Sequence, residues 1–247
     1  MIAVPRIKVR QWIGKKHNKE YKPKALRSRK NLEQPTSGAR GERKMAHKLI
    51  AIFARHGSTK LNDQGKFRGP ADPDLDDKGK EQAEQIGKQL KGRSFSGVFT
   101  SSKKRSKQTA DIALDGKKHK AVKNLDPLNV GDFAGQPKND ENMKQIVHHQ
   151  ENPDEVISGG ESINQFRARV NPKIKMIIRR GEDSGKPAVA FVHSSTIHQL
   201  GHLLHDDHNH VKVKPGGMAG VFKGPLGYYA KALTKESHDE KDKHMVS

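Results

Sequence analysis

The sequence predicts an α/β fold in which a mainly parallel sheet is covered by helices on both faces. Short apolar runs typical of strands alternate along the chain with segments that have the periodicity of amphipathic helices. The two strongest runs, residues 48–54 and 188–192, are apolar on both faces, as buried parallel strands are. Each run stops at a polar turn that contains a histidine, which places both turns at the carboxyl edge of the sheet.

The first elements follow in order from the local pattern. The strand over residues 48–54 leads into a loop, 62–73, that is rich in Gly, Asp and Pro. A helix is predicted over residues 80–90, because its apolar residues recur at helical spacing. A short apolar strand at 98–100 ends in a polar turn, and a helix that contains residues 109–114 follows it.

The later elements continue this alternation. In chain order they are a strand candidate at 120–123, an irregular loop at 125–135, helices at 140–149 and 162–178, a strand at 188–192, a helix to about residue 204, and two shorter strands at 219–222 and 228–233. The run at 188–192 is the most strand-like of the chain, because it consists of Ala, Val and Phe alone.

Charge and composition divide the chain into three regions. Residues 1–44 carry 14 Lys and Arg against 3 Glu, in a chain whose net charge is +20. They are too poor in apolar residues to form a core, which predicts a basic, largely flexible extension. It would be an arm for nucleic acid or another polyanion, with Trp12 and Tyr21 as stacking groups, or a solvated tail that docks on a partner. One domain is expected over 45–234, and a polar tail over 235–247.

The composition also excludes several classes of protein. The chain has no cysteine, so it has no disulfide framework, thiolate nucleophile or zinc ribbon. No apolar stretch approaches the length that spans a bilayer, and no signal-peptide-like apolar region follows the start. A cytoplasmic protein that does not contact membranes is expected.

Three predicted strand ends bring together residues suited to phosphate chemistry: Arg55 and His56, then Arg105, then His193. One imidazole can attack phosphorus as a nucleophile while cations hold the oxygen atoms. The nucleophilic histidine must be neutral, whereas the second is most useful when charged. With two arginines and an imidazolium, neither a metal nor a cofactor is required. Taken alone, an Arg-His-Gly triplet can arise by chance, and His193 could be a strand-end histidine with a structural hydrogen bond.

Four motifs in one order resemble those of the histidine phosphatase superfamily, the phosphoglycerate-mutase-like group. They are Arg55-His56-Gly57-Ser58-Thr59 with Asn62, Ser101-Ser102 through Arg105 to Thr109-Ala110, Gly159-Gly160-Glu161-Ser162, and Val192-His193-Ser194. The resemblance covers about residues 48–200. It implies the three-layer α/β/α sandwich of that family around the predicted sheet.

The resemblance also implies roles for individual residues. His56 would be the phospho-acceptor, and Arg55, Arg105 and His193 would form the phosphate pocket. Asn62 would be a further phosphate contact. Thr59 and Ser194, which lie in the same motifs, are the other candidate substrate-binding residues.

One position departs from the family pattern. Members with mutase or sugar-bisphosphatase activity usually carry a glutamate general acid in a Leu-x-Glu-x-x-x-Gly-x-x-x-Gly stretch, and here the acid position is Pro127. Proline can neither donate nor accept a proton, so the leaving oxygen must be protonated by Asp126, Asp132, water or nothing. Asp126 is the nearest substitute, although an aspartate in a loop is more often a turn residue.

These observations predict a metal-independent phosphatase that acts through a phosphohistidine on a small phosphorylated substrate or a phosphoprotein. Mutase activity is not expected, and aryl phosphates, anhydrides or phosphohistidine should react better than alkyl phosphates. The alternative is a non-catalytic phosphate- or polyanion-binding protein on the same fold, with the basic extension contacting nucleic acid or a partner.

Two further groups of residues have structural interpretations. His198, His202 and His205 share one face of the helix that follows residue 193, and helical histidines at this spacing can bind zinc or nickel. No carboxylate is interleaved with them, so a polar helix end with His198 at the pocket rim is preferred. Glu161 is expected in the first turn of a long helix, stabilised by the helix dipole.

Overall fold

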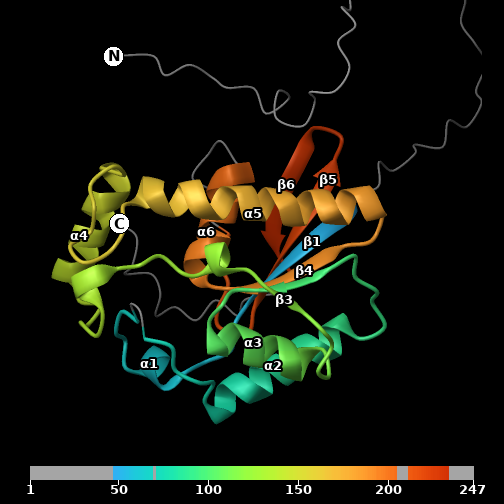
Figure 1. Ribbon diagram of the computed structural model, residues 1–247, viewed down its shortest axis with the longest axis horizontal. Coiled ribbons are helices and arrows are strands. Elements are labelled where there is room, and N and C mark those ends of the chain that lie inside the picture. Colours follow the sequence, from blue (N-terminus) through green and yellow to red (C-terminus); the bar gives the residue numbers. More distant parts are fainter. Residues whose placement is uncertain (1–46, 69–70, 205–210, 234–247) are drawn as a thin grey trace, which may run out of the picture.

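The computed structural model describes residues 47–68, 71–204 and 211–233. They form a six-stranded sheet with the strand order β3-β2-β4-β1-β5-β6 (Figure 1). The predicted basic extension over 1–44 and the polar tail over 235–247 lie outside the described residues. In the described ranges, no helix is both long enough and apolar enough to cross a membrane.

The two apolar runs that end in histidine-containing turns are β1 (Lys48–Arg55) and β4 (Ala188–Val192), and they pair in parallel at the centre of the sheet. β2 (Val98–Thr100) pairs in parallel with β4, and β3 (Lys120–Ala121) pairs in parallel with β2. The predicted α/β fold with a mainly parallel sheet is confirmed in this half of the molecule.

The other half of the sheet is a hairpin of β5 (Met218–Gly224) and β6 (Gly227–Ala232). β5 runs antiparallel to both β1 and β6, so the complete sheet is mixed. Antiparallel neighbours need only a tight turn, and here the turn follows directly on Gly224 without a crossover helix.

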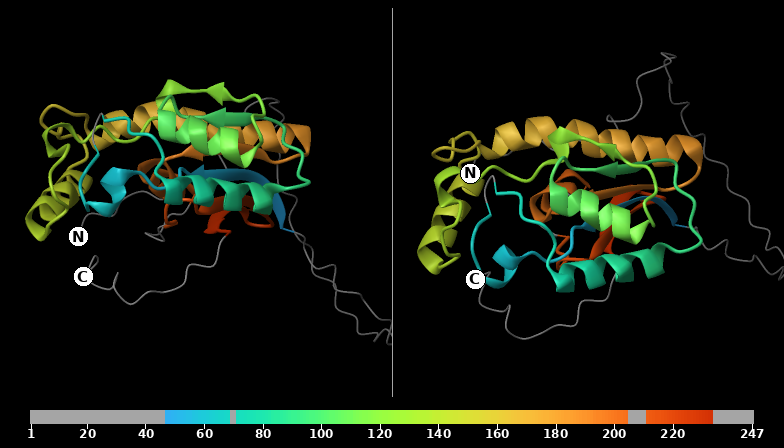
Figure 2. Two further views of the ribbon diagram at one scale, coloured as in Figure 1. Left: turned by 90° about the horizontal axis from the view of Figure 1, so that it is seen from below. Right: turned by 60° about the horizontal axis from the view of Figure 1, so that its bottom comes forward.

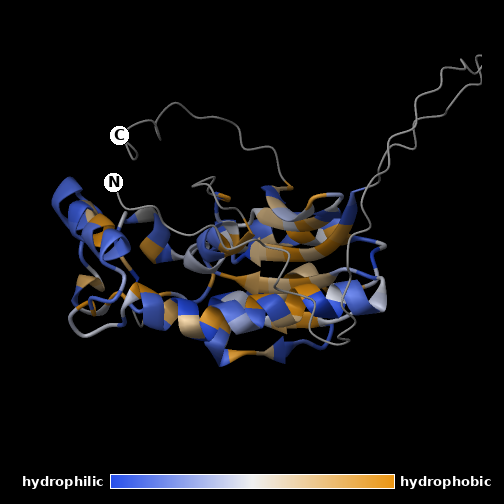
Figure 3. Ribbon diagram, turned by 90° about the horizontal axis from the view of Figure 1, so that it is seen from above, coloured by the Kyte–Doolittle hydropathy of each residue, from blue (hydrophilic) through white to orange (hydrophobic). Residues whose placement is uncertain are grey.

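Helices cover the two faces of the sheet, as Figure 2 shows from two further directions. They are α2 (Asp77–Leu90), α3 (Lys104–Ala113), α5 (Ile163–Ser184) and α6 (Ser194–Leu204). On β4, Val189 and Phe191 pack with α2 and α3, whereas the alternate residues pack with α5 and α6. This alternation of side chains produces the three-layer α/β/α sandwich, and Figure 3 shows apolar residues along the central strands.

A smaller lobe lies beside the carboxyl edge of the sheet and contains α1 (Lys60–Asp63) and α4 (Asp140–Glu151) (Figure 1). Its own apolar cluster is formed by Phe67, Phe133, Ile146 and Ile157. The irregular loop predicted over 125–135 leads from the main core, where Leu125 ends a 3-10 turn at Lys123–Leu125, into this lobe, where it contains a second such turn at Gly131–Phe133.

Among the helix boundaries that differ from the prediction, two have clear local reasons. α2 begins at Asp77 rather than at residue 80, because the Asp76 side chain caps it by accepting a hydrogen bond from the Gly79 N–H. α5 continues past residue 178 to Ser184 and stops at Gly185, whose positive φ of 72° suits the end of a helix.

Candidate active site

Three neighbouring strands end at the same place. His56 directly follows β1, His193 directly follows β4, and Ser101 directly follows β2. Because β2, β4 and β1 are adjacent in the sheet, the rings of the two histidines lie with their centroids 5.2 Å apart. The structure therefore brings together the residues that the sequence placed at separate strand ends.

The His56 ring is buried and oriented by its own turn. Its Nδ1 lies 2.7 Å from the carbonyl oxygen of Gly57, and a carbonyl oxygen can only accept a hydrogen bond. Nδ1 therefore carries the hydrogen, and the lone pair is on Nε2. Burial lowers the pKa of His56 well below its ordinary value, and the charges of Arg68, Arg105 and Arg55 lower it further. The ring is neutral at physiological pH, as a nucleophile must be.

The turn at Gly57 requires a glycine because α2 approaches it closely. A Cβ at Gly57 would lie 2.3 Å from the carbonyl oxygen of Gly79, and a Cβ at Gly79 would lie 2.1 Å from that of Ser58. Neither contact is possible for a larger residue without backbone movement. The N–H of Gly57 donates to Oγ1 of Thr109 on α3, which fixes the turn on its other side.

Arg105 is buried in the first turn of α3 and is held by the loop that precedes α2. Its Nη1 lies 3.3 Å from both Oδ1 of Asp72 and the carbonyl oxygen of Ala71. Asp72 also accepts two hydrogen bonds from the N–H of Lys104 at 2.9 and 3.0 Å, so one carboxylate caps the helix and pairs with the arginine. The pKa of Arg105 is lowered by burial and is raised in part by Asp72.

Arg55 is the last residue of β1. Its Nη1 donates to the carbonyl oxygen of Val213 at 2.8 Å, which fixes the guanidinium against the segment that leads into β5. Its charge acts on both His56 and Arg68. Arg55 thus belongs to the positive environment of His56.

His193 is bound by serine hydroxyl groups. Its Nε2 lies 2.8 Å from Oγ of Ser101 and 3.4 Å from Oγ of Ser106. Burial lowers the pKa of His193 well below its ordinary value, and His56 and Arg105 lower it further. This direction contradicts the expectation of a charged second histidine, because the sequence did not reveal how completely this strand end is buried.

Arg68 is a site residue that the sequence reasoning missed. Its Nη1 lies 2.8 Å from Nε2 of His56, and burial together with Arg105 and Arg55 lowers its pKa to about 9. A second missed cation is Lys138, whose pKa is lowered by partial burial and by Arg68 and Arg55. The available signal was weak, since both are ordinary basic residues in polar loops near the motifs.

Main-chain contacts bring these two loops together. Phe67 donates to the carbonyl oxygen of Gln136 at 2.9 Å and accepts from Gly135 at 2.8 Å, and Lys138 donates to Gly65 at 2.8 Å. This short antiparallel contact places Arg68 and Lys138 beside the same cavity.

The cavity has a volume of about 340 Å³. Its strand side consists of His56, Arg105 and His193, and its loop side includes Arg68, Pro127 and Lys138. The remaining lining residues are Lys66, Phe67, Leu128, Val130, Met143, Ile146, Ser194, Ser195 and His198. Among the described residues that line it, several are cationic and none is a carboxylate. This arrangement suits an anion with an apolar portion.

A family model for the histidine phosphatase superfamily, branch 1, matches residues 51–213, which include both histidines and both motif arginines. The chain belongs to the histidine phosphatase superfamily.

Relatives of this chain include mutases and a phosphatase. A 2,3-bisphosphoglycerate-dependent phosphoglycerate mutase of Afipia carboxidovorans is 29% identical over 63% of this chain and 80% of its own. Fructose-2,6-bisphosphatase TIGAR B of Danio rerio is 33% identical over 52% of each chain. The structure of a phosphoglycerate mutase from Bacillus anthracis str. Sterne shares the fold with a TM-score of 0.63, at 24% identity over 74% of this chain and 92% of its own.

Two of the candidate substrate-binding residues, Thr59 and Asn62, do not line the cavity. The N–H and the hydroxyl of Thr59 both donate to Oδ1 of Asn62 at 3.0 Å. The pair forms a capping box that begins α1. By contrast, Ser194 and His198 do line the cavity.

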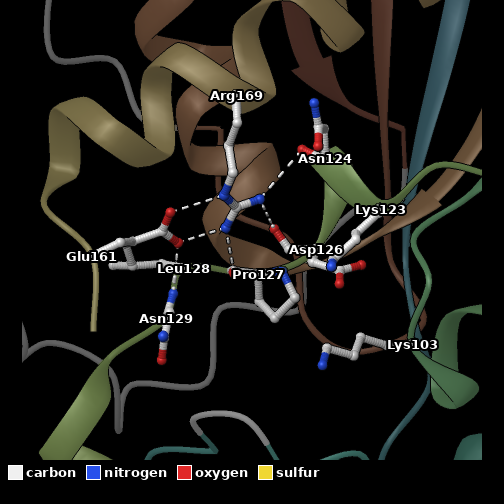
Figure 4. Close-up of a pocket in the computed structure, with 9 residues that line it drawn as sticks. All are labelled: Lys103, Lys123, Asn124, Asp126, Pro127, Leu128, Asn129, Glu161 and Arg169. Carbon is white, nitrogen blue, oxygen red and sulfur yellow. Dashed lines mark hydrogen bonds and ion pairs between the residues drawn. The ribbon is translucent and has the colours of Figure 1, made fainter. Parts of the chain in front are cut away.

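Asp126 is also directed away from the cavity. Its carboxylate accepts hydrogen bonds from the N–H of Ser102 at 2.8 Å and from the Ser102 hydroxyl at 2.6 Å. It lines a neighbouring cavity of about 320 Å³, shown in Figure 4, and Pro127 forms a wall of both cavities. This placement argues against the predicted acid role of Asp126.

Arg169 of α5 holds the loop that carries Pro127 (Figure 4). It donates to the carbonyl oxygens of Asp126 at 2.9 Å and Pro127 at 2.8 Å, and its Nε donates to Glu161 at 2.8 Å. Glu161 precedes the N-cap Ser162, so it is not in the first turn of α5 as expected. It instead accepts from the N–H of Asn129 at 2.8 Å and closes the clamp.

The described residues contain no group of three His, Asp or Glu side chains arranged to bind a metal ion. His198 and His202 lie on α6 with ring centroids 6.0 Å apart. The third histidine of that predicted row, His205, lies outside the described residues.

Proposed function

We propose that this histidine phosphatase is a metal-independent phosphohydrolase that acts through a phosphohistidine on His56. The observation that carries the proposal is the state of the His56 ring. It is buried and neutral, its Nδ1 hydrogen is bound to Gly57, and the charges of three arginines act on it. A neutral imidazole among fixed cations suits attack on a phosphoryl dianion.

In the proposed reaction, the lone pair of His56 Nε2 forms a bond to phosphorus while the bond from phosphorus to the leaving oxygen breaks. The leaving oxygen takes that electron pair. Arg55, Arg105 and His193 would surround the phosphoryl oxygens, and a bound dianion would favour protonation of His193. Water then attacks phosphorus, Nε2 regains its electron pair, and inorganic phosphate leaves.

Pro127 supports hydrolysis of reactive phosphates over mutase chemistry. It lines the cavity at the position where the family resemblance implies a glutamate acid. Protonation of a leaving group by a positioned acid contributes about 10²–10⁴-fold to the rate. The proposed substrates are therefore small phosphorylated compounds or phosphoproteins with good leaving groups, namely aryl phosphates, anhydrides or phosphohistidine.

The same proline favours a second candidate, a protein that binds phosphate or a polyanion without turnover. The cations of the loop side support binding in either case. In both cases we also propose that residues 1–44 contact nucleic acid or another polyanion, which their basic composition supports. Loss of salt-sensitive nucleic-acid binding on removal of residues 1–44 would test that role separately.

The test compares hydrolysis of an aryl phosphate with hydrolysis of an alkyl phosphate, with EDTA present, for the protein and for His56→Ala. The proposed enzyme cleaves the aryl ester at least about 10²-fold faster than the alkyl ester, and the variant is inactive. Equal rates on the two esters would contradict the prediction that the site lacks a general acid. Phosphate binding without turnover of either ester would support the binding protein.

A further inference from the structure

The hydrogen bond between Arg68 and His56 occupies the atom that the proposed chemistry needs. Nη1 of Arg68 lies 2.8 Å from Nε2 of His56. Because Nδ1 of the same ring donates to Gly57, Nε2 carries the lone pair and the guanidinium is the donor. Attack on phosphorus would use this same lone pair.

The guanidinium and a reacting phosphorus atom cannot both lie next to Nε2. Reacting atoms in a productive complex are about 3–3.5 Å apart. The Nη1 atom of Arg68, at 2.8 Å, fills that region. A phosphoryl group can therefore reach His56 only after the Arg68 side chain has moved.

A neutral imidazole is a weak partner for a partly buried cation. In the part of the chain that the structure describes, Arg68 forms no ion pair with a carboxylate, whereas Arg105 pairs with Asp72. The positive charges of Arg105 and Arg55 also repel the positive charge of Arg68. Phosphoryl oxygens would offer it the charged, bidentate partner that it lacks.

The main chain that precedes Arg68 is held by hydrogen bonds, so the movement would involve the Arg68 side chain. Phe67 exchanges main-chain hydrogen bonds with the 135–136 segment at 2.8 and 2.9 Å. The Phe67 ring is buried against Phe133, with centroids 5.8 Å apart. Rotation of the guanidinium would leave these contacts intact.

We propose that Arg68 masks the nucleophile until a phosphoryl dianion displaces it, and that it then holds the transferring phosphoryl group. The inference rests on the proposed role of His56 as phospho-acceptor. The guanidinium remains protonated throughout and only exchanges one acceptor, Nε2, for another, the phosphoryl oxygens. The freed lone pair forms the bond to phosphorus, and the electron pair of the broken bond leaves with the departing oxygen.

The first test measures the masking without requiring turnover. Diethyl pyrocarbonate acylates the free lone pair of a neutral imidazole, and mass spectrometry of the His56 peptide gives the rate. In Arg68→Met, which removes the donor and keeps much of the volume, His56 should be labelled about tenfold faster than in the unchanged protein. The midpoint of the pH dependence should also rise, because a neighbouring positive charge is gone.

Two further variants complete this test. Arg93→Met removes an exposed arginine from the loop that follows α2 and should change neither the rate nor the midpoint. Arg68→Gln replaces Arg68→Met if circular dichroism shows that the latter does not fold. An unchanged labelling rate with an unchanged midpoint would overturn the masking role, even if activity fell.

The second test measures the holding role through kcat for an aryl phosphate. Loss of one donor to a phosphoryl group should lower kcat by about 10²-fold in Arg68→Met, and Arg68→Lys should restore part of it. Faster labelling with an undiminished kcat would overturn this role. If the unchanged protein turns over no substrate, the proposed function fails, while the labelling rates still decide whether Arg68 masks His56.

Discussion

On the strand side of the cavity, each functional group has a partner of its own. Arg105 pairs with Asp72, and His193 is bound by Ser101. On the loop side, the hydrogen-bond partner of Arg68 among the described residues is a neutral imidazole, and Lys138 lies over the Phe67 ring, 5.6 Å from its centroid. Both sides carry positive charge, but on the strand side the charge of Arg105 is already paired with the carboxylate of Asp72.

The difference shows where a ligand would act most strongly. A compensated group is held in one geometry, which is what stabilisation of a transition state requires. An uncompensated cation gains more from an anion that arrives, because its charge has lost water without gaining a counter-charge. We therefore expect substitutions on the strand side to lower kcat the most, and the loop side, where Arg68 also holds the phosphoryl group, to determine which phosphates react. The following three experiments test this division.

The largest effect should come from the strand side. Arg105→Lys keeps the positive charge but loses the planar fork, so kcat for an aryl phosphate should fall by about 10²–10³-fold. The exposed Arg93→Lys is the matched control and should retain full kcat. If kcat for Arg105→Lys changed by less than about tenfold while its thermal stability was unchanged, the strand side would not be the rate-determining part.

A gain of activity should come from the loop side. Pro127→Glu places an acid on the wall of the cavity, so hydrolysis of an alkyl phosphate should rise by about 10²-fold, with little change for an aryl phosphate. Pro127→Gln, which has the same shape without the acid, should show no such gain. A similar gain in both variants would indicate that removal of the proline, and not proton donation, had caused it.

The smallest effect concerns stability of the strand side against pH. The folded-state pKa of both His56 and His193 is lowered, so the unfolded chain binds more protons below about pH 6.5. The free energy of unfolding should then fall as the pH decreases from 6.5 towards the folded-state values. Each histidine contributes at most about 1.4 kcal/mol per pH unit to this decrease in the free energy of unfolding.

Urea unfolding at pH 7.5 and at pH 5.5 measures this loss. It should be smaller in His56→Asn than in the unchanged protein, whereas the exposed His47→Asn should show the full loss. Equal losses in all three proteins would mean that burial of His56 does not exclude its proton.

The strand side was predictable from the sequence because its residues follow directly on apolar strands. An apolar run fixes the strand, parallel packing brings the carboxyl ends together, and residues such as His56 and His193 then meet without any long loop. The layers of the sandwich follow from the same alternation of side chains. The antiparallel direction of β5 did not follow, because a short apolar strand has the same pattern in either direction.

The loop side was not predictable because its contacts join residues far apart in the chain. Arg68 meets Lys138 only through the pairing of the 65–67 segment with the 135–138 segment, and neither segment has a strand pattern. The surroundings of His193 and Asp126 were not predictable for the same reason. The degree to which His193 is buried depends on distant elements, and nothing in the residues around Asp126 indicates that its carboxylate binds Ser102.

The clamp formed by Arg169 has a consequence for how such a protein changes over time. Arg169 binds the loop through the carbonyl oxygens of Asp126 and Pro127, which every amino acid possesses. These two hydrogen bonds therefore do not depend on the side chain at position 127. A single substitution there could add or remove a proton donor while the scaffold stays in place, so the range of accessible substrates could widen or narrow in one mutational step.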